Sequence, residues 1–249
     1  MNEFYVGYLP KAPVGIARRI RAVVVFLLVL AALLAIVFTR VQRTFAPSVF
    51  EFGKVSVFEG TIEKNPYPTL IVTGHGSTRP EFSRFLLVAE GKHGADAQVA
   101  AFAGKTVKLR GKRIYRDNQT MIELVSGSIS VVGDSTHPDQ ATKELGTFEL
   151  TGEIVDSKCY LGVMNPGNGK VHRDCAVRCL SGGIPPIFAA NDFNGVPAIF
   201  LLIGTNRSPL PKEAFLARVA QPLKIRGRVL QSGNALSLET ETSAISSLP

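Results

Sequence analysis

The chain has 249 residues, of which 45% are hydrophobic and 19% are charged, with 23 Gly, 15 Pro and three Cys. This composition excludes a disordered, collagen-like or disulfide-dense protein, and the length allows one or two domains. The formal net charge is +8, but residues 1–43 carry six Lys or Arg against one Glu, which is +5, so the rest of the chain carries +3. Because the basic excess flanks one hydrophobic segment, the charge indicates a membrane rather than a nucleic acid as partner.

Residues 22–39 read AVVVFLLVLAALLAIVFT and contain no charged residue, Gly or Pro. A helix of this length spans about 27 Å, close to the hydrocarbon thickness of a bilayer. The sequence therefore predicts a transmembrane helix at 22–39, retained as a signal anchor because it exceeds a signal-peptide core and no A-x-A cleavage site follows it. A cleaved signal peptide and a twin-arginine signal at Arg18-Arg19 are the alternatives.

The basic residues around this segment predict its orientation. Four Lys or Arg precede it and two follow it closely, so the positive-inside rule puts residues 1–21 in the cytoplasm and the rest of the chain outside. In a Gram-negative bacterium this is a single-pass inner-membrane protein whose C-terminal domains are periplasmic. We expect its partners to be the lipid bilayer and neighbouring membrane or periplasmic subunits, and no nucleic acid.

Short strand-like runs separated by turn residues follow a linker at 40–54. A polar stretch at 134–145 interrupts them and is typical of an interdomain linker. The sequence thus predicts one domain at 55–133 and a second at 146–249.

The two predicted domains resemble each other in the order of their sequence motifs, which indicates two similar structural units. The matching pairs are FEGTI at 58–62 with LTGEI at 150–154, FLLV at 85–88 with FLLI at 200–203, and VKLRGK at 107–112 with LKIRGR at 223–228. The strand order and size resemble OB-folds, which are five-stranded Greek-key barrels. The predicted fold class is mainly β: one N-terminal transmembrane helix and two tandem OB-like β-barrels, the second with a helical Cys/His insertion.

An insertion at 156–188 distinguishes the second half from the first. The offset between the halves grows from 92 residues at Gly60 and Gly152 to 115 at the two FLL runs, and all three cysteines lie in this interval. Residues 172–181 contain no Pro or Gly and are followed by Gly-Gly and then Pro-Pro, which predicts a short helix with a glycine C-terminus.

The insertion carries four candidate metal ligands. His172, Cys175 and Cys179 share one face of the predicted helix, and Cys159 at a strand end can fold back to meet them. This Cys3His set suits tetrahedral zinc or a thiolate–imidazole copper site, with Met164 as a weak extra partner for copper.

Two other interpretations of the cysteines stay open. A structural disulfide from Cys159 to Cys175 or Cys179 suits an oxidising compartment, but it leaves an odd thiol. A catalytic cysteine with His172 as base is the weaker interpretation, because the sequence shows no orienting third group and no oxyanion motif. We assign no catalytic residue and no organic cofactor.

The run DSKCYLGVMNPGNGKVHRDCAVRCLSGGIPP at 156–186, together with EFYVGYLP at the N-terminus, resembles a family of bacterial membrane-anchored exported proteins. The resemblance implies an exported, anchored domain and brings no activity with it. We therefore expect a periplasm-facing accessory, assembly or electron-transfer subunit of a membrane oxidoreductase system, with a Cys3His metal or redox site. The alternative is a non-catalytic structural or interaction module whose cysteines form a stabilising disulfide.

Overall fold

The computed structural model describes residues 12–41, 48–73, 82–117, 119–134 and 142–248, which fall into two units, 1–45 and 46–249. The first unit contains one helix, α1 (Val14–Val41), which begins directly after Pro13. The helix is long and apolar enough to cross a membrane, and none of its residues is buried within the described chain. It contains the predicted span 22–39 and extends beyond it at both ends. The first 11 residues of the predicted cytoplasmic segment lie outside the described residues.

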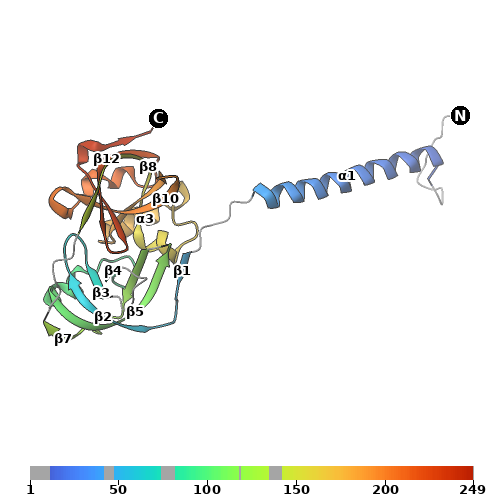
Figure 1. The fold of residues 1–249 in the computed structure, drawn as a ribbon. Helices are drawn as coiled ribbons and strands as arrows, with labels where there is room; N and C mark the ends of the chain where they lie inside the picture. Colours follow the sequence, from blue (N-terminus) through green and yellow to red (C-terminus); the bar gives the residue numbers. More distant parts are fainter. Residues whose placement is uncertain (1–11, 42–47, 74–81, 118, 135–141, 249) are drawn as a thin grey trace. The chain divides into compact units, whose positions relative to one another are not determined.

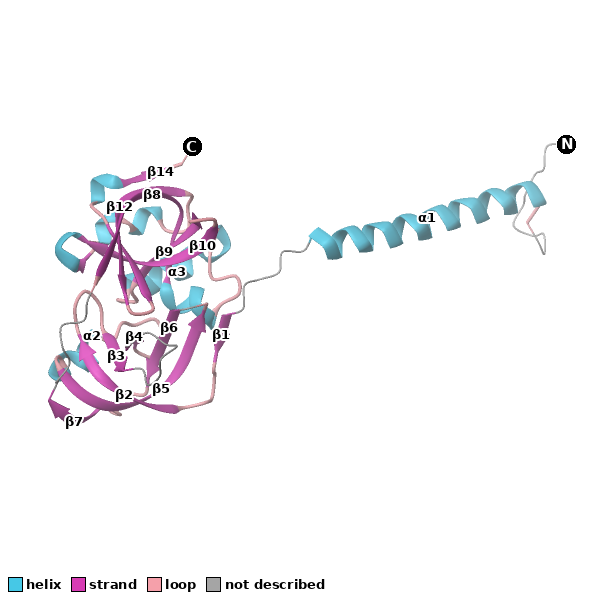
Figure 2. Ribbon diagram, in the orientation of Figure 1, coloured by secondary structure: helices cyan, strands magenta, loops and turns pink. Residues whose placement is uncertain are grey.

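The first barrel is closed by five strands (Figures 1 and 2). They are β2 (Ser56–Glu63), β3 (Thr69–Thr73), β4 (Phe82–Val88), β5 (Lys105–Arg116) and β6 (Gln119–Leu124). The sheet runs in the order β5-β2-β3-β4-β6, and β6 pairs with β5 again to close the barrel; only the β4–β6 pairing is parallel. The short strands β1 (Ser48–Phe50) and β7 (Ser130–Asp134) pair with β5, and α2 (Asp96–Val99) and η1 (Ala100–Phe102) connect β4 to β5.

The second barrel repeats this topology in the order β12-β8-β9-β10-β13 and closes through the β12–β13 pairing. Its strands are β8 (Lys143–Asp156), β9 (Pro186–Phe193), β10 (Val196–Gly204), β12 (Leu223–Ser232) and β13 (Ala235–Glu239). Its smaller elements are η4 (Thr205–Arg207), β11 (Ser208–Pro209), η5 (Lys212–Ala214), η6 (Leu216–Arg218), η7 (Thr242–Ala244) and β14 (Ile245–Ser247). The prediction of two OB-like barrels is confirmed.

Glycines of the repeat occupy equivalent places in the two barrels. A side chain at Gly60 on β2 would collide with the backbone carbonyl of Ile71, and one at Gly152 on β8 would collide with that of Ala189. Strand glycines commonly mark such close approaches of a neighbouring backbone. The sequence repeat therefore preserves the points at which each small barrel brings adjacent strands closest together.

Three groups of buried apolar side chains hold residues 46–249 together. One fills the first barrel, a second fills the second barrel, and the third joins residues of both barrels, such as Leu86 and Met121 from the first and Ile187 and Ile199 from the second. Cys159 and Cys179 belong to this third group. The predicted site is therefore located where the two barrels pack on each other.

The strands extend into both predicted linkers. β1 lies within 40–54 and pairs with β5, so part of that stretch belongs to the first barrel. β7 and β8 enter 134–145 from its two ends, and residues 135–141 lie outside the described part of the chain. Residues 46–249 form one compact unit, so the two barrels are parts of a single body.

Candidate metal centre

The insertion folds into three short helical pieces between β8 and β9. Cys159 begins the turn η2 (Cys159–Val163), His172 ends η3 (Lys170–His172), and α3 (Arg173–Ser181) carries the other two cysteines. The predicted helix at 172–181 is thus confirmed except that His172 lies in the 3₁₀ turn that leads into it. The Gly182 N–H bonds back to the Arg178 carbonyl at 3.0 Å and ends the helix as the Gly-Gly pair predicts.

The structure places the four predicted residues in two overlapping groups that share Cys159. Potential ligand atoms of Cys159, His172 and Cys175 lie within 4.8 Å of one another, and the same limit holds for Asp156, Cys159 and Cys179. Cys159, His172 and Cys179 are buried, and Cys175 is partly exposed. All three cysteines are free thiols, so the disulfide considered from the sequence is not formed. Cys159 folds back from the end of β8 as predicted.

Asp156 is the first residue that the sequence analysis missed. Its side chain is fully buried at the end of β8, and its Oδ2 lies 2.9 Å from Nε2 of His172. Its Oδ1 accepts a hydrogen bond of 2.8 Å from the Cys159 backbone N–H. In the tautomer whose Nε2–H donates to this carboxylate, the lone pair of the imidazole is on Nδ1, where a metal ion can bind it. Asp156 therefore orients a ring nitrogen and a cysteine at once.

The thiols of Cys159 and Cys179 differ in acidity because they contact each other. A hydrogen bond from Cys159 is the main cause that lowers the pKa of Cys179 to about 7, against the opposing effect of burial. The same hydrogen bond, together with burial, raises the pKa of Cys159. Cys179 is therefore the more acidic thiol of this pair and Cys159 the less acidic one.

Lys92 brings a positive charge to the thiols from the first barrel. Its Nζ atom lies 2.8 Å from Sγ of Cys175 and 3.9 Å from Sγ of Cys179. The hydrogen bond to Cys175 raises the pKa of Lys92, which keeps the ammonium charged. Since an ammonium group beside sulfur favours thiolates, Lys92 counters the negative charge that three deprotonated cysteines accumulate.

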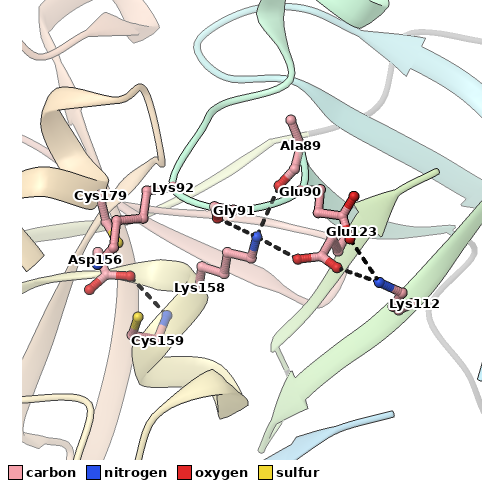
Figure 3. A network of polar contacts seen from close by, with 10 residues as sticks. All are labelled: Ala89, Glu90, Gly91, Lys92, Lys112, Glu123, Asp156, Lys158, Cys159 and Cys179. Carbon is pink, nitrogen blue, oxygen red and sulfur yellow. Dashed lines mark hydrogen bonds and ion pairs between the residues drawn. The ribbon is translucent and has the colours of Figure 1, made fainter. Parts of the chain in front are cut away.

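Lys158, the residue before Cys159, points away from the sulfurs into the first barrel (Figure 3). Its Nζ donates to the carbonyl oxygens of Ala89 at 2.9 Å and Gly91 at 2.6 Å and pairs with Oε2 of Glu123 at 2.6 Å. Lys112 pairs with the other Glu123 oxygen at 3.0 Å. These contacts fix the segment 156–159 against the loop that carries Lys92.

The Gly-Gly end of α3 has a second role that the sequence did not predict. The loop after β4 packs directly on it, and the Gly94 N–H donates to the Gly182 carbonyl at 2.9 Å. A Cβ at Gly182 would collide with the backbone carbonyl of Lys92. Glycine at 182 thus permits the approach that carries the Lys92 ammonium to the sulfurs.

The residues present fit a metal ion with tetrahedral coordination by three sulfur atoms and one nitrogen. Zn–S bonds of about 2.3 Å place the sulfurs of such a site about 3.8 Å apart, and the ligand atoms of Cys159, His172 and Cys175 already lie within 4.8 Å of one another. Met164 is 45% exposed and lies on the surface rather than among the buried ligands. Part of the signal for the missed residues was in the sequence, because Asp156 and Lys158 are charges next to Cys159 at the end of a strand.

The chain matches no protein-family model, no curated protein and no solved structure. The functional assignment therefore depends on the chemistry of the site.

Proposed function

We propose that Cys159, His172, Cys175 and Cys179 bind a thiolate-preferring metal ion in a membrane-anchored, periplasm-facing accessory or assembly subunit of a membrane oxidoreductase system. The observation that carries the proposal is the cluster of three free thiols, two of them buried, beside a histidine that lies 2.9 Å from Asp156. Four protein ligands leave no open coordination position, which is the pattern of a metal that is held rather than one that performs catalysis.

Charge favours Zn²⁺ over Cu⁺ at this site. Three thiolates and a neutral imidazole give the four ligands a charge of −3, and the buried Asp156 carboxylate beside His172 adds −1. The Lys92 ammonium, 2.8 Å from Cys175, brings the sum back to −3, so bound Zn²⁺ leaves −1 and bound Cu⁺ leaves −2. Because Zn²⁺ has no redox chemistry, this favours an accessory or assembly role over electron transfer.

The proposed location is supported by α1 and its flanking charges. The helix is long and apolar enough to cross a membrane, and more basic residues precede its apolar span than follow it. Alkaline phosphatase fused after residue 249 should be active and the fused chain should resist a salt wash of membranes. Activity of a cytoplasmic reporter at the same position would contradict the orientation.

The first experiment is the metal content of the full-length chain purified in detergent. We expect about one equivalent of zinc by mass spectrometry in the wild type, and its loss in His172→Ala and Cys175→Ser. His93→Ala is the matched control because His93 is exposed and belongs to the same loop as Lys92. Equal metal content in His172→Ala and His93→Ala would contradict the site.

The second candidate function is a structural or interaction module without metal. The Lys92–Cys175 contact favours it, because this hydrogen bond joins the two barrels without a metal ion. Absence of metal from the wild type, with three thiols titrating after denaturation, would support this alternative.

A strain that lacks the gene separates the roles further, since a Cys159→Ser copy should fail to restore membrane oxidoreductase activity only if the metal site serves that system.

A further inference from the structure

A cavity of about 450 Å³ lies between the two barrels, and none of the described Cys or His residues lines it. Its size is within the range of pockets that bind small molecules. Leu86 from β4 forms part of one wall, and Leu201, Ile203 and Leu230 from β10 and β12 form part of the opposite side. The cavity is thus a site distinct from the thiol cluster, with an apolar interior that both halves of the repeat build.

Among the described residues, three ionisable side chains line this cavity, Glu63, Arg84 and Arg207, and their formal charges sum to +1. The Arg84 guanidinium is fixed across the barrels, because it donates to Glu63 Oε2 at 2.7 Å and to Ser232 Oγ at 2.9 Å. The Arg207 guanidinium forms no hydrogen bond or ion pair with the residues that the structure describes. Arg207 is exposed, so its positive charge faces solvent rather than a protein anion.

The two arginines also act on each other. Burial, and then the charge of Arg207, lower the pKa of Arg84 against the opposing effect of Glu63. Two guanidinium groups that repel each other across a cavity are stabilised by an anion between them. A single negative charge on a ligand would neutralise the lining charge of +1.

The backbone that presents Arg207 is unusual. Asn206 and Arg207 have φ angles of 57° and 55°, a left-handed conformation that is uncommon for two successive residues other than glycine. The Arg207 N–H donates to Glu239 Oε1 at 3.1 Å, which holds this turn in place. Strained backbone of this kind is often retained where it positions a side chain for binding.

Gln119 supplies a second, independent indication of a ligand. Gln119 lines the cavity and is only 7% exposed. Its Nε2 atom has no hydrogen-bond partner among the described residues. A buried amide donor without a partner is unfavourable, and an oxygen acceptor on a bound molecule would satisfy it once the amide turns toward the cavity.

From these observations we propose that the cavity binds a small organic monocarboxylate, whose carboxylate contacts Arg207 and Gln119 and whose apolar body packs on Leu86, Leu201 and Leu230. A carboxylate matches the planar guanidinium of Arg207, and its single charge matches the net charge of the lining. The apolar walls select against a fully hydrated anion such as phosphate, because those walls gain nothing from it.

The test is calorimetric titration of the full-length chain in lipid nanodiscs, with empty nanodiscs as the blank. The probes are butyrate, 3-phenylpropionate and octanoate, each compared with the alcohol of the same skeleton and with inorganic phosphate. We expect saturable binding of at least one carboxylate, and binding at least about tenfold weaker for its alcohol and for phosphate. No saturable binding by any carboxylate, or equal binding of phosphate, overturns the proposal.

Two variants locate the binding in this cavity. Arg207→Gln should weaken the carboxylate about tenfold or more, whereas Arg226→Gln, at an exposed position on β12, should leave the affinity unchanged. Gln119→Leu should also weaken binding while it leaves the thermal midpoint of the free protein equal or higher, because it removes the unpaired amide. Unchanged affinity in both Arg207→Gln and Gln119→Leu would place the ligand elsewhere and overturn the proposal. Metal content should be the same in all of these variants.

Discussion

The Nζ atom of Lys158 lies 2.6 Å from Oε2 of Glu123, and this ion pair joins the second barrel to the first through two side chains that are 4% and 7% exposed. Burial of Glu123 by itself raises the pKa of its carboxyl, but hydrogen bonds from Lys158 and Lys112 outweigh burial and lower that pKa overall. The carboxylate therefore stays charged inside the interface, and its two lysines compensate it.

Replacement of Glu123 by Ala should destabilise the protein strongly. The change leaves the buried ammonium of Lys158 without its partner, which typically costs about 3–5 kcal/mol. Glu149→Ala is the matched control, because Glu149 pairs with Lys224 at 2.9 Å on the surface, where such pairs contribute about 1 kcal/mol or less. Urea unfolding followed by circular dichroism compares the two, and equal free energies of unfolding would contradict this role of the Lys158–Glu123 pair.

Asp156→Asn should weaken metal binding about 10- to 100-fold while the fold is kept. The amide oxygen can still accept from the Cys159 N–H, but the amide NH₂ would donate to Nε2 of His172 and move the ring proton to Nδ1. Competition with a zinc chelator measures the affinity. Asp192→Asn on β9 is the control, since Asp192 is exposed; a similar affinity in both variants would show that Asp156 does not orient the histidine.

Gly152→Ala should cost at least about 2 kcal/mol of unfolding free energy. Its Cβ would collide with the Ala189 carbonyl in the β8–β9 pairing, and backbone on both sides would have to move. Gly133→Ala is the control, because Gly133 has open space around it and should change stability by no more than about 0.5 kcal/mol. A neutral Gly152→Ala variant would show that the strands can separate there without loss of the barrel.

Deprotonation of the Tyr67 hydroxyl should lower the free energy of unfolding at high pH. Its hydroxyl bonds the Leu202 carbonyl and the Leu210 N–H across the interface, and burial raises its pKa to about 12. The folded protein keeps the phenol proton that the unfolded chain loses near pH 10, so this contribution is complete below pH 10 and is lost as the pH rises toward 12. The loss amounts to about 2–3 kcal/mol.

The variant Tyr67→Phe tests this assignment. Its unfolding free energy should be about 1 kcal/mol lower at neutral pH, because one hydrogen-bonding group is removed, and it should fall less steeply than that of the wild type between pH 10 and 12. Parallel decreases of both proteins in that range would assign the alkaline loss to other groups.

The elements that depend on local pattern could be predicted from the sequence. The uncharged run at 22–39 lies within α1, and the repeated glycine motifs led to two barrels of one topology. The gathering of Cys159 with His172 followed from helical spacing and from the strand that precedes Cys159.

The remaining parts of the site depend on how the barrels pack. Lys92 is 83 residues before Cys175, and no periodicity in either half relates them. The charges of Asp156 and Lys158 could be seen in the sequence, but their partners could not, since those partners belong to a helix start and to the opposite barrel. Sequence spacing predicts residues on one helix face; it does not predict which loop of a second barrel covers that face.

Lys158 and Cys159 are consecutive, yet one side chain ends in the first barrel and the other in the thiol cluster, while Lys92 reaches the same cluster from the opposite direction. A metal ion bound to the cysteines would therefore hold the insertion in one conformation, and the contacts of Lys92 and Lys158 would pass that restraint to the first barrel. Its removal should leave each barrel folded and increase the hydrogen exchange of the backbone around 89–95 and 156–159, so that the amount of bound metal sets the rigidity of the joint.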